Sequence, residues 1–471
     1  MSHNTSINLV SLSKVSFKNL IELVQMKRVG FLILVMAVIA FASCNKQDYK
    51  TVMHNPDLYC KTMHELNYVI IYDIFNPPVA SRIFAYSNLA AYETLSKEGK
   101  HYSSLEGKLN GLKNIPSPAK PDKVDFPFAS IIAMTKVGKA LTFSEDRMQA
   151  LIDSIKGLAK NTNMTKEMFD SSVNYGGRVA DSILSWSKKD NYGKTRGSKF
   201  TVTGLEGHWS PTPPGYFDAV EPKWQTIRTL ALDSANMFSI EPPPAFSKDS
   251  TSEFYKMAKQ VYNTVNSLDT TQQWIANFWD CNAFKMHQEG HVMFATKAMT
   301  PPGHWMEIIG SISKEKNADW YQTVFNYTGS AMAMFDGFIA CWYYKYYYDM
   351  IRPETYINQY IDPNWKPFLQ TPPFPEYISG HSVISAASAE FVSRVYGDKV
   401  SFTDSSERDW GYADRKFESM SDCSMEVSMS RFYGGIHYYK AVIEGRNQGN
   451  KIGDLIVDKL MATKKEVAKT N

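Results

Sequence analysis

Three short segments near the C-terminus constrain this chain more than any other feature, because together they carry the groups needed to bind one tetrahedral oxyanion. They are Lys345-x6-Arg352-Pro353, Ser379-Gly380-His381 and Ser430-Arg431-x5-His437. The segments supply three cations, hydroxyl groups, a backbone amide at a glycine and two imidazoles. An ion with several negative oxygens needs such an array to leave water. We therefore expect a fold that gathers these three segments around one site.

The spacing resembles the signature of the superfamily of vanadium haloperoxidases and type 2 phosphatidic acid phosphatases, which is Lys-x6-Arg-Pro, then Pro-Ser-Gly-His, then Ser-Arg-x5-His-x3-Asp. The first segment matches in full. Ile378 replaces the proline of the second segment, and Ala441 replaces the closing aspartate of the third. Trp342, three residues before the lysine, and the Pro-Phe-Pro sequence around Phe374 are similar to the haloperoxidase branch.

The resemblance implies a role for each signature residue. It assigns His437 as the residue that bonds to vanadium, or that attacks phosphorus in a phosphatase, and His381 as the acid–base group. The implied cofactor is vanadate, and the implied substrates are hydrogen peroxide and a halide. The residues expected to bind the oxyanion are Lys345, Arg352, Ser379, Gly380 and Arg431.

Ala441 is the main departure from the family pattern. A carboxylate at this position would orient the imidazole of His437 and raise its basicity. Without it, we expect a backbone carbonyl or another residue to hold the second ring nitrogen of His437. Asp280 is a candidate carboxylate partner for His381, and a helix-capping role is its alternative.

The local sequence predicts how the site residues are presented. Lys345 and Arg352 lie on one face of the helix predicted over 321–349 if that helix persists to residue 351, and Pro353 limits its further extension. Their aromatic surroundings favour burial over a solvated surface pair. Ser379 and Gly380 precede a predicted helix over 382–396, whose N-terminus presents free amides and the positive end of the dipole to an anion.

The fold class predicted from apolar residues at helical spacing is all-α, with an architecture of helix bundles. A turn-rich stretch over 190–250 separates an N-terminal helical region (59–245) from a C-terminal helical domain (246–465) that carries the site. The predicted helices are 67–74, 80–96, 129–142, 144–160, 165–188, 252–268, 272–282, 287–297, 321–349, 382–396 and 445–463.

The N-terminus is predicted to be a lipoprotein signal segment over 1–43, with Met26 as its natural start and Cys44 as the lipidated residue. The apolar part is too short to span a bilayer comfortably, and a buried amphipathic helix is the alternative. Residues 44–58 are then a tether. We expect export to the bacterial cell envelope and a membrane contact through the lipid on Cys44, with the membrane face and the oligomeric state left open.

Composition narrows the classes of partner and cofactor. A net charge of +3 and no dense basic stretch give no indication of nucleic-acid binding. Cys60, Cys281, Cys341 and Cys423 form no Cys-x-x-Cys pair, so zinc motifs are not indicated, although one or two disulfides are possible.

Histidines outside the signature are assigned structural roles. His287 and His291 stand at i and i+4 of a predicted helix, but the acid between them falls one position late for His-Glu-x-x-His. His208 and His304, each beside a tryptophan, are expected to be loop or core residues rather than ligands.

Three candidate functions are consistent with these residues. The preferred one is a vanadium-dependent haloperoxidase-like enzyme, because of Trp342 and the Pro-Phe-Pro sequence. The alternatives are a phosphomonoesterase acting through a phosphohistidine at His437, and a surface protein that binds an oxyanion without catalysis. Phe374 is similar to a position that is aromatic in chloride-oxidising members, but one residue does not define the halide.

Overall fold

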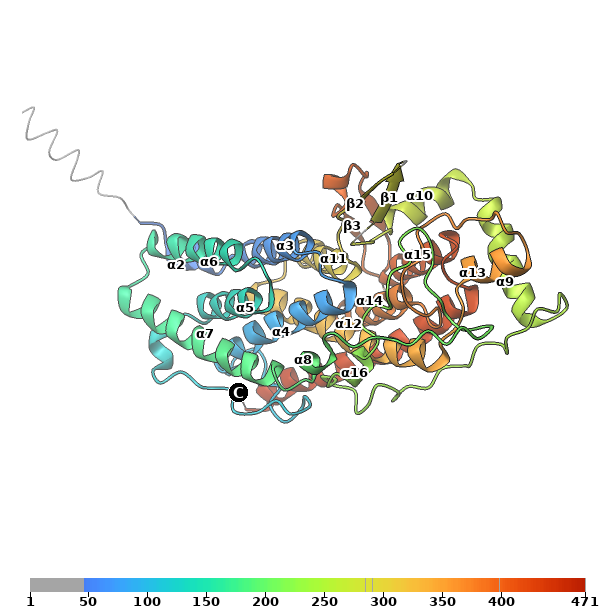
Figure 1. Cartoon of the computed structure of the whole chain (residues 1–471). Helices are drawn as coiled ribbons and strands as arrows, with labels where there is room; N and C mark the ends of the chain where they lie inside the picture. The colour runs from blue at the N-terminus through green and yellow to red at the C-terminus, as the bar shows by residue number, and fades with distance from the viewer. Residues whose placement is uncertain (1–45, 284, 290, 398, 471) are drawn as a thin grey trace, which may run out of the picture.

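The chain is almost entirely helical, which confirms the predicted all-α class (Figure 1). The structure, a computed structural model, describes residues 46–283, 285–289, 291–397 and 399–470. The elements up to residue 226 are α2 (Tyr49–Met53), α3 (Pro56–Tyr72), α4 (Pro77–Ser96), η1 (Pro121–Lys123), α5 (Phe126–Leu141), α6 (Glu145–Lys160), α7 (Lys166–Ser187), α8 (Tyr192–Thr195) and η2 (Trp224–Thr226). Those that follow are α9 (Glu253–Asn266), α10 (Thr270–Phe278), β1 (Lys285–Glu289), β2 (Val292–Thr296), α11 (Pro301–Glu315), α12 (Trp320–Tyr348), α13 (Pro353–Tyr360), α14 (Gly380–Tyr396), β3 (Phe402–Asp404), η3 (Arg408–Trp410), β4 (Arg415–Phe417), α15 (Met420–Tyr433) and α16 (Tyr439–Thr470).

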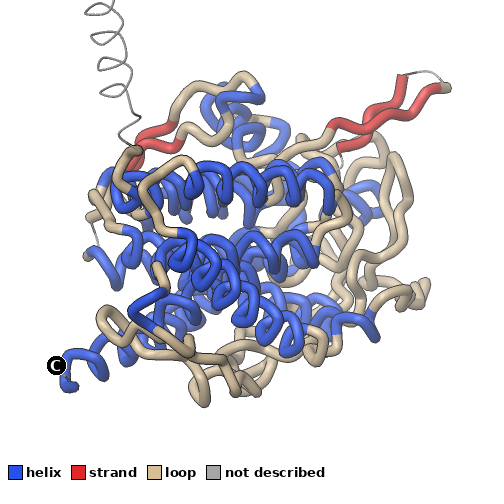
Figure 2. Tube along the Cα trace, turned by 90° about the vertical axis from the view of Figure 1, so that its left-hand side faces the viewer, coloured by secondary structure: helices blue, strands red, loops and turns tan. Residues whose placement is uncertain are grey.

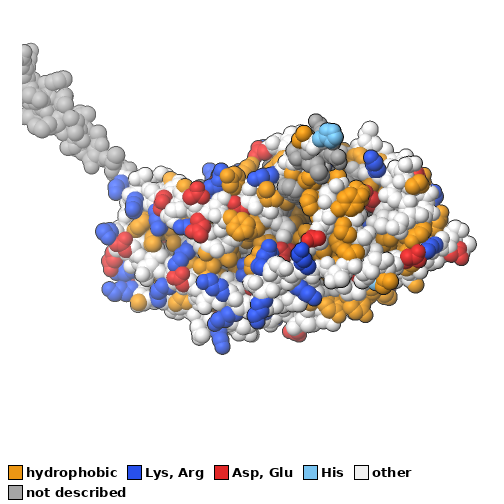
Figure 3. Space-filling model, viewed as in Figure 1, with side chains coloured by type: hydrophobic (Ala, Val, Ile, Leu, Met, Phe, Trp, Pro, Cys, Tyr) orange, Lys and Arg blue, Asp and Glu red, His pale blue; other side chains and the backbone are white. Residues whose placement is uncertain are grey.

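Helices from the two parts of the chain share one hydrophobic core. Figure 1 shows α2 to α7 at one end and α9, α10, α13 and α15 at the other, with α16 returning the C-terminus to the N-terminal part. Helix α12 packs against both α4 and α14, and one cluster of buried side chains runs through all of them. The boundary near residue 245 stays a prediction. On the face in Figure 3, Lys and Arg side chains alternate with Asp and Glu over the N-terminal part.

The long helix α12 is buried around almost its whole circumference, as expected for a helix that is apolar on every side. It begins after Asp319, whose side chain accepts a hydrogen bond from the amide of Gln322, and ends at Tyr348 because Asp349 takes a left-handed conformation. The helix therefore ends within one residue of the predicted end and does not persist to residue 351, so Lys345 and Arg352 do not share a face of one helix. Pro353 starts α13, where a proline at the first helical position loses no hydrogen bond.

A single carboxylate in the middle of α12 anchors the irregular connection between the two parts. Asp336 is fully buried and accepts hydrogen bonds from the backbone amides of Leu230, Ala231 and Leu232 at 2.7, 2.7 and 3.0 Å. Burial raises the pKa of Asp336 to about 6. The connection is thus pinned to the helix that ends at Lys345.

Helix α16 lies directly on the backbone of α14, the helix that begins at the Ser-Gly-His segment. Gly445, Gly449 and Gly453 face it at intervals of four residues, and a methyl group on Gly449 would overlap the carbonyl oxygen of Val383. Only glycine permits this approach. The small residues of α16 therefore help to set the position of the N-terminus of α14.

The structure corrects several expectations about local structure. Part of the expected tether over 44–58 is helical, since α2 and the start of α3 occupy it and Met53 is buried. The helix expected over 287–297 is the antiparallel hairpin β1–β2, with Lys285 opposite Thr296, and it projects from the helical body in Figure 2. The second strand contains Val292, Phe294 and Thr296, residue types that favour extended chain. Helices α11, α13 and α15 were not among the helices predicted from the sequence.

Other expectations concern the N-terminus and the cysteines. The signal segment, Met26 and Cys44 lie outside the described residues. Within the described residues, no helix has the length and apolar character needed to cross a membrane. The four described cysteines are free, so the possible disulfides are not formed.

We expect Gly449→Ala to lower the free energy of unfolding by about 1–3 kcal/mol, because the added methyl group overpacks the α14–α16 contact. Urea denaturation followed by circular dichroism measures this. Gly157→Ala is the matched control: the new methyl group on α6 would meet no atom within 4 Å, so the substitution should be neutral or slightly stabilising. Equal stability of Gly449→Ala and the wild type would contradict the proposed close packing.

Candidate oxyanion-binding active site

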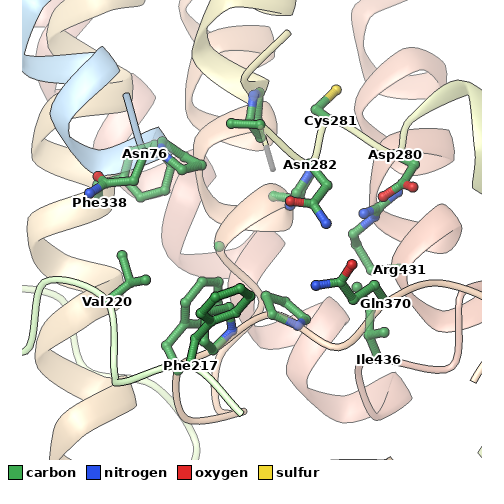
Figure 4. Close-up of a pocket in the computed structure, with 18 of the residues that line it drawn as sticks. Asn76, Phe217, Val220, Asp280, Cys281, Asn282, Phe338, Gln370, Arg431 and Ile436 are labelled. Carbon is green, nitrogen blue, oxygen red and sulfur yellow. The ribbon is translucent and has the colours of Figure 1, made fainter. Parts of the chain in front are cut away.

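The three signature segments meet at one cavity of about 460 Å³. Figure 4 shows Phe217, Val220 and Phe338 on one side of it and Asp280, Cys281 and Arg431 on the other. Of the residues expected from the sequence, those that line the cavity are Asp280, Trp342, Phe374, Gly380, His381, Arg431 and His437. Lys345, Arg352 and Ser379 lie behind these residues, so the structure brings the whole predicted set together.

The three cations of the site are buried without carboxylate partners. Lys345 and Arg352 are 0% exposed and Arg431 is 2% exposed. Among the described residues, none of the three forms an ion pair with an acidic side chain. Removing a charge from water is costly unless it is paired. The three side chains therefore create a positive region that an anion would stabilise.

Backbone carbonyls hold two of the cations in place. Lys345, in the last turn of α12, donates from Nζ to the carbonyls of Pro375 and Glu376 at 3.0 and 2.9 Å. Burial lowers the pKa of Lys345 to about 7 and that of Arg352 to about 10. Arg352 donates from Nε to Phe374 O and from Nη1 to Ile436 O, both at 2.8 Å, while its buried Nη2 has no partner within the described chain.

Arg431, in the last turn of α15, is held in place on the other side of the cavity by a backbone carbonyl and a hydroxyl group. Its Nη2 donates to the carbonyl of Trp279 at 2.6 Å, and its Nε donates to the hydroxyl of Ser430 at 2.9 Å. Burial lowers the pKa of Arg431. The segment after α10 therefore decides where this guanidinium points.

His437 is oriented by a carboxylate that the sequence analysis did not assign. Its Nδ1 lies 2.7 Å from Oε1 of Glu376, an oxygen that also accepts the backbone amide of Tyr438 at 2.9 Å. Glu376 is fully buried, and burial raises its pKa to about 7. Burial and the charge of Arg352 lower the pKa of His437 well below its ordinary value. A neutral imidazole that donates from Nδ1 to Glu376 keeps its lone pair on Nε2, which lies 3.3 Å from Nη1 of Arg352.

Glu376 takes the place of the carboxylate that is missing at Ala441. Ala441 is fully buried in the first turn of α16, and its carbonyl accepts the backbone amide of Ser379 at 3.1 Å. The expectation that another residue would hold the second ring nitrogen of His437 is thus met by a residue of the proline-rich segment. Its only sequence signal is a single acid beside the Ser-Gly-His motif.

The Ser-Gly-His segment forms the N-terminus of α14, as expected. Ser379 is the N-cap, and its hydroxyl accepts from the amide and the hydroxyl of Ser382 at 3.4 and 2.9 Å. His381 stands in the first turn and lines the cavity, with an Nε2 atom that has no partner within the described residues. Burial and the charge of Arg431 lower the pKa of His381 well below its ordinary value.

Asp280 is not the partner of His381. It lines the cavity, but its carboxylate pairs with Lys285 at 2.9 Å. Two other histidines, expected to be loop or core residues, pair with carboxylates: His208 with Asp349 at 2.8 Å, and the buried His304 with Asp404 at 2.7 Å.

Two aromatic side chains close the cavity over the cations. Trp342 and Phe374 contact each other with ring centroids 5.0 Å apart, and Phe374 lies 5.0 Å from both Lys345 Nζ and the Arg352 guanidinium. The indole of Trp342 donates to the carbonyl of Val220 at 3.2 Å. Other wall residues come from distant segments and were not predicted from the sequence; they include Asn76, Phe217, Val220, Asn282, Phe338 and Gln370.

Comparisons with known proteins agree with this geometry. Residues 326–466 match the family model described as the VCPO second helical-bundle domain. The chain is 44% identical to the protein in a structure described as the first bacterial vanadium-dependent iodoperoxidase, with a TM-score of 0.81 and coverage of 86% of this chain and 97% of that one. Holo- and apo-type structures of a bacterial vanadium-dependent chloroperoxidase share the fold, at 18% identity and a TM-score of 0.62, with 83–84% of this chain and 94–96% of theirs covered. A search of curated proteins gave no match.

The signature residues around one cavity, the helical fold and 44% identity over most of both chains lead to one family. This chain is a member of the vanadium-dependent haloperoxidases.

Proposed function

We propose that this protein oxidises iodide with hydrogen peroxide, using vanadate bound to His437. The observation that carries the proposal is the set of three buried cations without carboxylate partners beside two neutral histidines. The 44% identity to a bacterial iodoperoxidase supports iodide as the halide.

The donors around the cavity fit a tetrahedral oxyanion. Within the described residues, the buried atoms Nη2 of Arg352 and Nε2 of His381 have no hydrogen-bond partner. The free amides at the start of α14 add neutral donors beside these groups. Bound vanadate would act as a Lewis acid that polarises peroxide, with His437 Nε2 as its protein ligand and Lys345, Arg352 and Arg431 balancing its charge.

His381 is the residue that moves protons in this proposal. Its lowered pKa leaves the ring neutral at pH 7, so it takes up a proton from incoming peroxide at a ring nitrogen and returns it to the oxygen that leaves. Lys345 keeps the positive charge beside this step, since an anion in the site opposes the effect of burial on its pKa.

The apolar side of the cavity supports a large, weakly hydrated halide. Phe217, Phe338, Trp342 and Phe374 line it together with Val220. An ion such as iodide, which gives up its water more easily than chloride, loses less hydration energy on entering such a pocket.

We propose that the protein is exported and held at the bacterial cell envelope by a lipid on Cys44. The lipobox-like Phe41-Ala42-Ser43-Cys44 after a short apolar stretch supports this location.

Vanadate-loaded protein should convert iodide faster than bromide in the presence of peroxide, followed by triiodide absorbance and by bromination of a dye. His437→Ala should lower the rate about 100-fold or more, a loss typical of removing one preorganised polar group. His291→Ala, at an exposed position on the hairpin, is the matched control and should keep the wild-type rate. Hydrolysis of a chromogenic phosphate ester without halide oxidation would replace the proposal with the phosphatase alternative, and tight phosphate binding with neither activity would favour a binding protein.

Glu376→Ala should weaken vanadate binding about 10–100-fold, because Nδ1 of His437 loses its partner. Glu376→Gln should weaken it less, since the amide oxygen can still accept from Nδ1. Equilibrium dialysis measures both affinities. Glu444→Ala removes another buried carboxylate, one that accepts the amide of Glu241 outside the cavity, and should bind vanadate like the wild type. Wild-type affinity in Glu376→Ala would refute the positioning role.

Cys44→Ser should move the protein from the membrane fraction to the soluble fraction and abolish incorporation of labelled palmitate, because the acceptor thiol is lost. Cys60→Ser serves as the control and should stay membrane-bound and labelled. Labelling of Cys44→Ser at the wild-type level would contradict a lipid at this residue.

A further inference from the structure

Behind one wall of the cavity, Cys281, His304 and Glu407 direct ligand atoms toward one another. Sγ of Cys281 lies 3.4 Å from Nδ1 of His304, and Oε1 of Glu407 lies 3.3 Å from the same nitrogen. The three ligand atoms all lie within 4.8 Å of one another, and all three residues are buried. They come from the segment after α10, from the first turn of α11 and from the loop after β3, so only the tertiary fold brings them together.

A fourth residue determines the state of the imidazole. Nε2 of His304 lies 2.7 Å from Oδ2 of Asp404. The other oxygen of Asp404 accepts from the amide and the hydroxyl of Ser406 at 3.0 and 2.6 Å, so this carboxylate is held as an acceptor. Nε2 therefore donates to Asp404, and Nδ1 is the nitrogen that faces the thiol and Glu407. Burial lowers the pKa of His304, but the nearby Asp404 and Cys281 raise it well above its ordinary value, so a metal ion would replace a proton on Nδ1. Metal-bound histidines typically have such a carboxylate on their second nitrogen.

The two distances from Nδ1 of His304 match the edges of a tetrahedral zinc site. With Zn–S of about 2.3 Å and Zn–N and Zn–O of about 2.0–2.2 Å, sulfur and nitrogen ligands lie about 3.5 Å apart, and nitrogen and oxygen ligands about 3.3 Å apart. The corresponding distances here are 3.4 and 3.3 Å. One position of the tetrahedron would remain for water.

The charges of the three ligands also suit a divalent cation. One thiolate and one carboxylate cancel the two charges of Zn²⁺, and the neutral imidazole adds none, so the bound cluster would have no net charge at this buried position. Thiolate, imidazole and carboxylate are common zinc ligands.

We propose that Cys281, His304 and Glu407 bind one Zn²⁺ ion, with Asp404 orienting His304. This site adjoins the oxyanion cavity, which Cys281 also lines, but it uses none of the residues assigned to the oxyanion and does not depend on which oxyanion binds there. No sequence pattern indicated this site, because the ligands share no short spacing motif and His304 was assigned to a loop or the core.

The position of the cluster indicates what the metal would do. Trp279 stacks on His304 with ring centroids 4.5 Å apart, and the carbonyl of Trp279 holds Arg431 at 2.6 Å. Cys281 follows two residues later and lines the cavity; in Figure 4 its sulfur points away from Gln370 and Ile436. Zinc would therefore fix the wall segment that places Arg431 beside the oxyanion.

Metal binding to the full-length protein tests this inference. Protein purified under reducing conditions and treated with a chelator should bind one equivalent of Zn²⁺, measured by competition with a chromophoric chelator and by elemental analysis. Co²⁺ in the same site should give a thiolate-to-cobalt charge-transfer absorption. Reduced wild-type protein that takes up no zinc and shows no such absorption would overturn the proposal. The proposal would also be overturned if the Cys281 thiol were oxidised by peroxide but bound no zinc.

Variants distinguish zinc binding at these ligands from nonspecific zinc binding elsewhere on the protein. Asp404→Asn should lower zinc affinity about 10–100-fold, and Cys281→Ser should lower it further and remove the charge-transfer absorption. Cys60→Ser, on α3, is the matched control and should bind like the wild type. Wild-type zinc affinity in Cys281→Ser would overturn the site. Removal of zinc by a chelator should also weaken vanadate binding in the wild type. An unchanged vanadate affinity would contradict the inference that zinc helps to position Arg431.

Discussion

Positive charge buried without carboxylate partners is the constraint on which the rest of this structure depends. Lys345, Arg352 and Arg431 are almost completely removed from water, and backbone carbonyls are their main protein partners. Carbonyl dipoles lower the cost of this burial only in part, as the pKa of about 7 for Lys345 indicates. A bound oxyanion would balance these charges. Because the ion would bind only the folded protein, it would also raise the free energy of unfolding.

The scaffold holds these charges with few degrees of freedom. Helix α12 ends three residues after Lys345, and α13 begins directly after Arg352, so both cations stand at helix ends. Close packing of α14 on the glycines of α16 places the amides of the Ser-Gly-His segment, and Ala441 accepts one of them. Each group is positioned by backbone, which moves less than a side chain. This is the preorganisation that catalysis by electrostatic stabilisation requires.

Much of the fold and most of the site could be predicted from local patterns. Apolar spacing predicted the long helices, and the signature predicted which residues meet at the cavity. The hairpin at β1–β2 was predicted as a helix because its short apolar run fits both periods. Glu376 was not assigned, since the family pattern places the carboxylate after the histidine, and Asp280 was given a partner although Lys285 neutralises it. Both errors concern which side chain faces which, a matter of three-dimensional packing.

The sequence by itself determined the all-α class, the resemblance to a family and which residues were expected to bind the oxyanion, because these depend on residue type and on spacing along one chain. Only the tertiary structure decided that Glu376 replaces the carboxylate missing at Ala441, that phenylalanines from separate segments form an apolar wall, and that Cys281, His304 and Glu407 meet behind it. The physical reason is that a hydrogen bond or a ligand set requires atoms within about 3 Å, and residues that are tens of positions or more apart in the sequence satisfy this only when the whole core is packed.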